Sequence, residues 1–150
     1  MRGLTCILVM VLAAGALGGG AKTDDLLKKH LAHYQGRWQC TGGNDFNGKP
    51  IPKAAAEKVT LTVEGTSFTM HDDANNMTIK GTFKLDPTKK PPAIDVMLEG
   101  SKDEPLRGIY EIVDDNTRRS CISVGGPRPE KFVNDPSYIT IQWKRIAKKP

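Results

Sequence analysis

The fold is decided by residues 77–113, which read MTIKGTFKLDPTKKPPAIDVMLEGSKDEPLRGIYEIV. This stretch contains two runs, 77–85 and 94–98, in which apolar and polar residues alternate. Because successive side chains of a strand point to opposite faces, one face of the first run would hold Met77, Ile79, Phe83 and Leu85. The prolines within residues 86–92 confine the reversal to a loop, since proline cannot donate to a central ladder. The stretch therefore predicts a long antiparallel hairpin with one buried face and one solvated face.

Similar alternation recurs along the chain and predicts further strands at 37–41, 59–63, 67–71, 106–113, 118–124 and 138–146. Residues 23–34 predict one short helix, with Thr23 or Asp24 capping its first turn and Gly36 ending it. There is no alternation of strands with helices and no internal repeat. The pattern is typical of an all-β chain of about eight antiparallel strands, arranged as a sandwich or a barrel and preceded by one short N-terminal helix.

The first residues of the chain have the composition of an export signal. Arg2 supplies a positive charge, residues 7–17 form a short apolar core, and residues 19–21 are small. The core is shorter than the roughly 20 apolar residues that a membrane-spanning helix needs. We therefore predict a signal peptide at 1–21 and one domain at 22–150, exported to the periplasm or secreted, with no stable membrane insertion after cleavage.

The charge of the chain argues against nucleic acid as a partner. The formal net charge is +5, and the basic residues are spread along the sequence. A nucleic-acid interface needs basic residues clustered with exposed aromatic ones, so we expect these charges to be solvated.

The sequence contains no readable set of catalytic residues. His30 and His33 are one helical turn apart, a spacing that can hold a metal, but no third ligand is identifiable, so neither a metal nor another cofactor is expected. Asp95, Glu99 and Glu111 could in principle pair as the carboxylates of a glycoside hydrolase, although acidic residues on a strand's outer face are usually solvated. We expect no enzymatic activity, and a hydrolase is the least favoured reading.

Two short features resemble a known pattern. Gly36-Arg37-Trp38, at the exit of the predicted helix, resembles the Gly-x-Trp signature of lipocalins and their calycin relatives. The resemblance implies that Arg145, near the end of the last strand, stacks over Trp38 and that this pair closes one end of a barrel.

Most of residues 22–150 is also similar to an uncharacterised family of secreted planctomycete domains. The similar segments are 35–38, 48–52, 81–91, 94–95, 108–111 and 128–132. The resemblance implies a lipocalin-like, up-and-down antiparallel barrel with no established activity. Members of that family often have a cysteine at the position of Cys121 without a partner at that of Cys40.

A disulfide between Cys40 and Cys121 would thus be particular to this protein. If the first strand pairs with the last, the two cysteines lie on second-neighbour strands, roughly 9–10 Å apart, whereas a disulfide requires Cα atoms within about 7 Å. Export would permit the bond, and a cross-barrel contact or strong twist could allow it, so this possible disulfide is left open.

An eight-stranded barrel either fills its interior with side chains or holds one small ligand. The candidate lining residues are Trp38, Phe68, Met70, Ile79, Phe83, Val96 and Tyr110. We expect the domain to bind a small hydrophobic molecule inside the barrel. The alternative is a cell-envelope protein–protein interaction module with a filled, purely structural barrel, for which the sequence identifies no protein partner. The volume of the interior cavity distinguishes the two readings.

Overall fold

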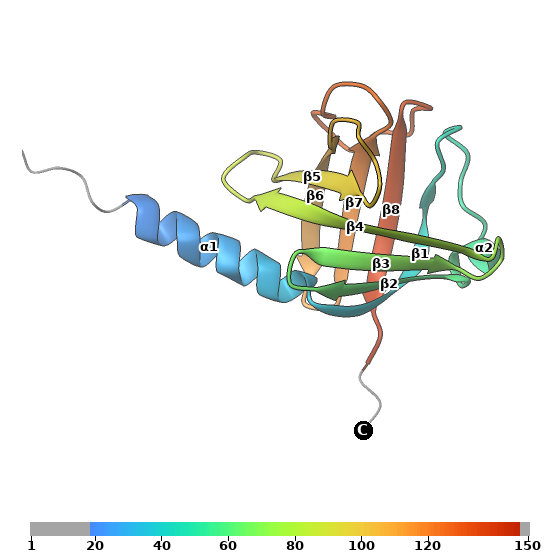
Figure 1. The fold of residues 1–150 in the computed structure, drawn as a ribbon, viewed down its shortest axis with the longest axis horizontal. Helices are drawn as coiled ribbons and strands as arrows, with labels where there is room; N and C mark the ends of the chain where they lie inside the picture. Colours follow the sequence, from blue (N-terminus) through green and yellow to red (C-terminus); the bar gives the residue numbers. More distant parts are fainter. Residues whose placement is uncertain (1–18, 148–150) are drawn as a thin grey trace, which may run out of the picture.

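The computed structural model describes residues 19–147 and shows one long helix beside a curved sheet (Figure 1). Helix α1 covers Gly19–Tyr34, and a short helix, α2, covers Lys53–Ala56. The strands are β1 (Gly36–Asn44), β2 (Val59–Glu64), β3 (Ser67–Asp72), β4 (Met77–Asp86), β5 (Ala93–Leu98), β6 (Leu106–Asp114), β7 (Thr117–Ser123) and β8 (Tyr138–Arg145). No helix in this part of the chain is long and apolar enough to cross a membrane.

The eight strands form one closed antiparallel barrel in which every strand pairs with its neighbours in sequence. β8 also pairs with β1, with Arg145 opposite Trp38, and this pairing closes the barrel. Closure leaves no free sheet edge, which is how an up-and-down barrel avoids open backbone pairing sites. The predicted all-β, antiparallel up-and-down barrel with one leading helix is confirmed, and the sandwich alternative is excluded.

The β4–β5 hairpin follows the predicted alternation along most of its length. Phe83 pairs with Val96 and Leu85 pairs with Ile94, and all four side chains are buried. The prediction is wrong at Met77, which is 44% exposed. β4 begins there, directly after its turn with β3, so this end of the strand does not face the packed interior.

Gly81, in the middle of β4, is required by the close approach of its neighbours. A Cβ atom at this position would lie 2.2 Å from the carbonyl oxygen of Met97 and 2.8 Å from the ring of Phe68. Since real Cβ atoms do not come that close to other atoms, any side chain here would displace the neighbouring strand.

Helix α1 begins four residues before the predicted start at Thr23. The Thr23 hydroxyl donates a 2.9 Å hydrogen bond to the carbonyl oxygen of Gly19, as a residue inside a helix does. Asp24 also lies inside α1, so the prediction that Thr23 or Asp24 caps the helix is wrong. The last part of α1 packs on the barrel as predicted: Leu27 and Leu31 contact the core, and Tyr34 is buried in it.

Of the predicted signal peptide, residues 1–18 lie outside the described residues, and residues 19–21 form the beginning of α1.

Cys40 and Cys121 are both buried and not bonded to each other, so the possible disulfide is not formed. β8 lies between their strands, as the second-neighbour geometry requires. In addition, Cys40 belongs to the interior core and pairs with Trp143, whereas Cys121 pairs with Thr140 further along β8. Ser120 lines the interior, and Cys121 therefore points to the opposite face of the sheet.

Candidate ligand-binding cavity

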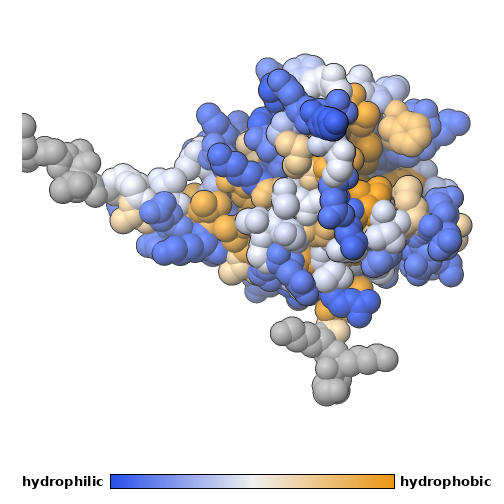
Figure 2. All heavy atoms as spheres, viewed as in Figure 1, coloured by the Kyte–Doolittle hydropathy of each residue, from blue (hydrophilic) through white to orange (hydrophobic). Residues whose placement is uncertain are grey.

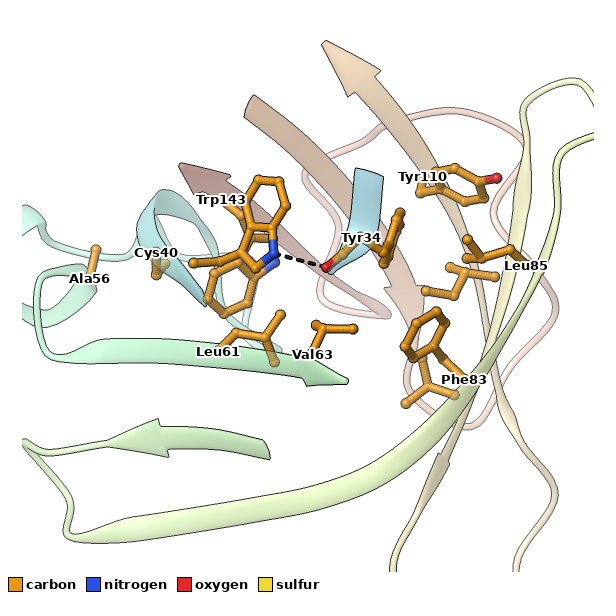
Figure 3. Close-up of a cluster of buried hydrophobic side chains, with 12 residues drawn as sticks. Tyr34, Cys40, Ala56, Leu61, Val63, Phe83, Leu85, Tyr110 and Trp143 are labelled. Carbon is orange, nitrogen blue, oxygen red and sulfur yellow. Dashed lines mark hydrogen bonds between the residues drawn. The ribbon is translucent and has the colours of Figure 1, made fainter. Parts of the chain in front are cut away.

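One end of the barrel is closed by a cluster of aromatic and arginine side chains, which we call the floor: Tyr34, Trp38, Tyr110, Arg118 and Arg145. Trp38 is fully buried, and its indole Nε1 donates a 3.0 Å hydrogen bond to the backbone oxygen of Tyr34. This bond is the dashed line that ends at Tyr34 in Figure 3. The guanidinium carbon of Arg145 lies 4.2 Å from the centre of a Trp38 ring. The structure therefore brings together the two residues that the Gly-x-Trp resemblance associates.

Arg145 connects the last strand to the end of α1. Its Nη1 donates to the backbone oxygen of Gln35 at 2.6 Å, and its Nη2 donates to that of His33 at 2.7 Å. Carbonyl oxygens near a helix C-terminus have no partner within the helix, and a basic side chain satisfies them well. Arg145 thus holds α1 against the barrel.

Arg118, the second arginine of the floor, is only 2% exposed. Its guanidinium carbon lies 3.8 Å from the centre of the Tyr34 ring and 4.1 Å from that of Trp38. The only hydrogen bond that its side chain makes within residues 19–147 runs from Nη1 to the backbone oxygen of Tyr34, at 3.3 Å. Burial lowers the pKa of Arg118 to about 10, so the side chain is still charged at neutral pH.

The aromatic part of the floor is packed by ring contacts. Tyr34 lies 5.3 Å from Phe83 and 5.4 Å from Tyr110, measured between ring centres, and the contact with Tyr110 is edge-to-face. The Tyr110 hydroxyl is joined to Nδ1 of His30 by a 2.7 Å hydrogen bond. Burial raises the pKa of Tyr34 to about 12 and also raises the pKa of Tyr110, so both are protonated at neutral pH.

Above the floor, the barrel interior contains a cavity of about 230 Å³ that is partly open to solvent. Its wall is almost entirely apolar, and no Asp or Glu lines it. In the space-filling view, apolar surface is visible within a hollow of the barrel between hydrophilic groups (Figure 2). An engineered cavity of about 150 Å³ with a comparable aliphatic and aromatic lining stays dry and binds benzene. The space is thus large enough for a small organic molecule.

The structure divides the predicted lining residues between the wall and the floor. The wall contains Phe68, Met70, Ile79, Phe83 and Val96. Trp38 and Tyr110 instead lie in the floor, beneath the cavity. The lining also includes residues that the prediction did not name: Tyr34, Leu61, Val63, Ile94, Leu98, Leu106, Arg118, Arg119, Ser120, Ile122, Ile139, Ile141 and Trp143. The alternation of apolar and polar residues along each strand was the sequence signal that could have identified these inward-facing side chains.

A second hollow, of about 590 Å³, lies outside the barrel between α1 and strands β6 and β7. It contains His30 and His33, the histidines one turn apart. The His33 ring lies 5.5 Å from a Trp38 ring, and its buried Nε2 has no hydrogen-bond partner among the described residues. Burial, followed by the charges of Arg118 and Arg145, lowers the pKa of His33 to about 4, so the ring is neutral at pH 7.

Of the three acidic residues considered as a carboxylate pair, Asp95 and Glu111 are each paired with an arginine rather than with each other. Asp95 accepts a 2.7 Å bond from Arg128, and Glu111 forms an ion pair with Arg119. Among residues 19–147, no group of three or more His, Cys, Asp or Glu side chains is arranged to hold a metal ion.

Comparisons with other proteins do not assign this geometry to a known activity. The chain matches no protein-family model, and neither the curated proteins nor the solved structures contain a significant match to it.

Proposed function

We propose that this domain is an exported lipocalin-like protein that binds a small, mainly apolar molecule inside its barrel. The observation that carries the proposal is the apolar cavity of about 230 Å³ above a packed floor. Protein interiors are normally filled to the density of organic crystals, and side chains around an empty space lose dispersion contacts. A bound apolar molecule would restore these contacts, which favours binding over the alternative of a filled, purely structural barrel.

Two further observations support the lipocalin-like part of the proposal. The barrel is closed and up-and-down, and Arg145 lies over Trp38 where the helix meets the first strand. Two further parts of the proposal rest on the sequence alone: membership of the planctomycete family on the resemblance, and removal of residues 1–21 as a signal peptide on the composition of those residues.

The proposal can be tested by filling the cavity. Leu98 lines the wall near the end of β5, and Met97, its neighbour in the chain, is exposed on the outer face. Leu98→Trp should occupy the cavity, whereas Met97→Trp adds the same side chain outside it. We expect a polarity-sensitive fluorophore to bind the wild type and Met97→Trp, and to lose at least about tenfold in affinity for Leu98→Trp.

Native mass spectrometry of gently purified protein provides a second measurement, since a tightly held apolar ligand would add a discrete mass. Circular dichroism should show that both variants remain folded. A wild-type protein that binds neither the fluorophore nor any co-purified molecule, or a Leu98→Trp variant that binds as well as the wild type, would contradict the proposal.

A further inference from the structure

The floor of the cavity contains a buried cation whose charge the described residues do not balance. Arg118 is 2% exposed, and it forms no ion pair with any carboxylate in residues 19–147. Burying an unpaired charge is costly, and proteins usually place an opposite charge beside it. A guanidinium so placed points to an anion that comes from outside the chain.

The hydrogen-bonding capacity of Arg118 is also largely unused. A guanidinium has five N–H donors, and this one makes a single bond at 3.3 Å, to a carbonyl oxygen that already accepts the indole N–H of Trp38. Arg118 lines the lower end of the cavity. Arg145, which also lies over Trp38, has short bonds to two backbone oxygens and contributes nothing to the cavity wall.

The rings around Arg118 fix its orientation without using its donors. The Tyr34 and Trp38 rings both lie within about 4 Å of the guanidinium carbon, and such contacts involve the face of the planar group rather than its N–H edge. A donor edge held in one orientation loses little freedom when it binds, which increases affinity for a planar, bidentate acceptor. Ser120, two residues further along the same face of β7, provides a second polar group in the cavity wall.

We infer that the molecule bound in the cavity carries a carboxylate, which Arg118 holds at the floor while the apolar body fills the space above. This inference rests on the proposed function and adds the chemical class of the ligand. Because a cavity of about 150 Å³ accepts benzene, the space of about 230 Å³ suits a carboxylic acid with a short alkyl chain or a single ring.

The test compares octanoate with 1-octanol, which has the same chain length but no charge. Binding of each to the full domain is measured by isothermal titration calorimetry for the wild type, Arg118→Gln and Arg145→Gln. We expect the wild type to bind octanoate at least about tenfold more tightly than 1-octanol, since only a carboxylate offers the guanidinium an opposite charge and two acceptor oxygens for a bidentate pair. Arg118→Gln should reduce this preference to near one, whereas Arg145→Gln should retain it.

The possible outcomes separate the inference from the proposed function. Equal wild-type affinities for octanoate and 1-octanol would overturn the carboxylate inference and leave apolar binding intact. If neither probe binds, both the inference and the proposed function fail. Should Arg118→Gln not fold, the side-chain ¹⁵N–H signals of Arg118 in the wild type decide: a shift with octanoate but not with 1-octanol supports the inference, and no shift with octanoate overturns it.

Discussion

The floor and the cavity lie in the same barrel and are built from the same strands, yet one is filled and the other is hollow. β6 contributes Tyr110 to the floor and Leu106 to the cavity wall, and β8 contributes Arg145 and Ile139 in the same way. The number of strands fixes the width of a barrel, so the size of the inward side chains determines whether the interior fills. Large aromatic and guanidinium groups, together with Tyr34 from α1, fill the floor, whereas the wall above it, which is mainly aliphatic with a few aromatic rings, leaves space.

The largest expected difference between the two regions concerns truncation of a side chain. Trp38→Ala removes a fully buried indole from the packed floor and should reduce the free energy of unfolding by about 3–5 kcal/mol. Leu98→Ala, in the wall of a space that is already open, should cost no more than about 1 kcal/mol. Urea unfolding followed by circular dichroism measures both values, and similar losses for the two variants would contradict the distinction between floor and cavity.

A smaller effect is expected for the contact between α1 and the barrel. Arg145→Gln removes the ring stacking and short bonds to two backbone oxygens, and should cost about 2 kcal/mol. Lys144→Gln is the matched control, because Lys144 is the exposed neighbour on the same strand and should change stability by less than about 0.5 kcal/mol. The same urea titration compares them, and an Arg145→Gln variant as stable as the control would show that the arginine does not hold the helix.

The smallest predicted effect is a pH dependence due to His33, whose ring lies beside Trp38 of the floor. The pKa of His33 is lowered from 6.5 to about 4 in the folded protein, so the unfolded chain binds a proton first as the pH falls. The stability due to neutral His33 is therefore fully present above about pH 6.5 and is lost between pH 6.5 and 4. Because this ring is partly exposed, we expect a loss of only about 1 kcal/mol.

Replacement of His33 by glutamine isolates this contribution from that of the acidic groups. Between pH 7 and pH 4.5, the free energy of unfolding of His33→Gln should fall by less than that of the wild type. An identical pH dependence in the two proteins would contradict the lowered pKa.

The fold was largely predictable from the sequence because its signals are local. Alternation in β4 and β5, with prolines confined to the turn between them, correctly gave the hairpin and the inward positions of Phe83 and Leu85. The errors in the fold prediction occurred near the ends of elements, at Met77 and at Thr23. The sequence does not show where a helix or strand ends or what packs against its last residues.

The site was less predictable because it depends on how far side chains from separate strands extend into one space. Residues such as Phe68 and Ile79 could be assigned to the interior, but their alternation does not reveal whether they meet or leave a gap. The expectation that the basic residues are solvated is wrong for Arg118, which lies near the start of β7 and is only 2% exposed. Arg118, Ser120 and Ile122 are alternate residues of one strand, so their side chains share the inner face of the barrel. The sequence does not predict this position, because arginine is rarely buried in proteins.

The most direct test of the account is a methyl NMR titration of the wild-type domain with octanoate. The account predicts saturable chemical-shift changes concentrated on the cavity wall, at residues such as Ile79, Leu98, Ile122 and Ile141, with little change at the exposed methyl groups of Val113 and Val124. Shift changes confined to exposed methyl groups, or no saturable change at any methyl group, would contradict the claim that the hollow part of the barrel binds a ligand.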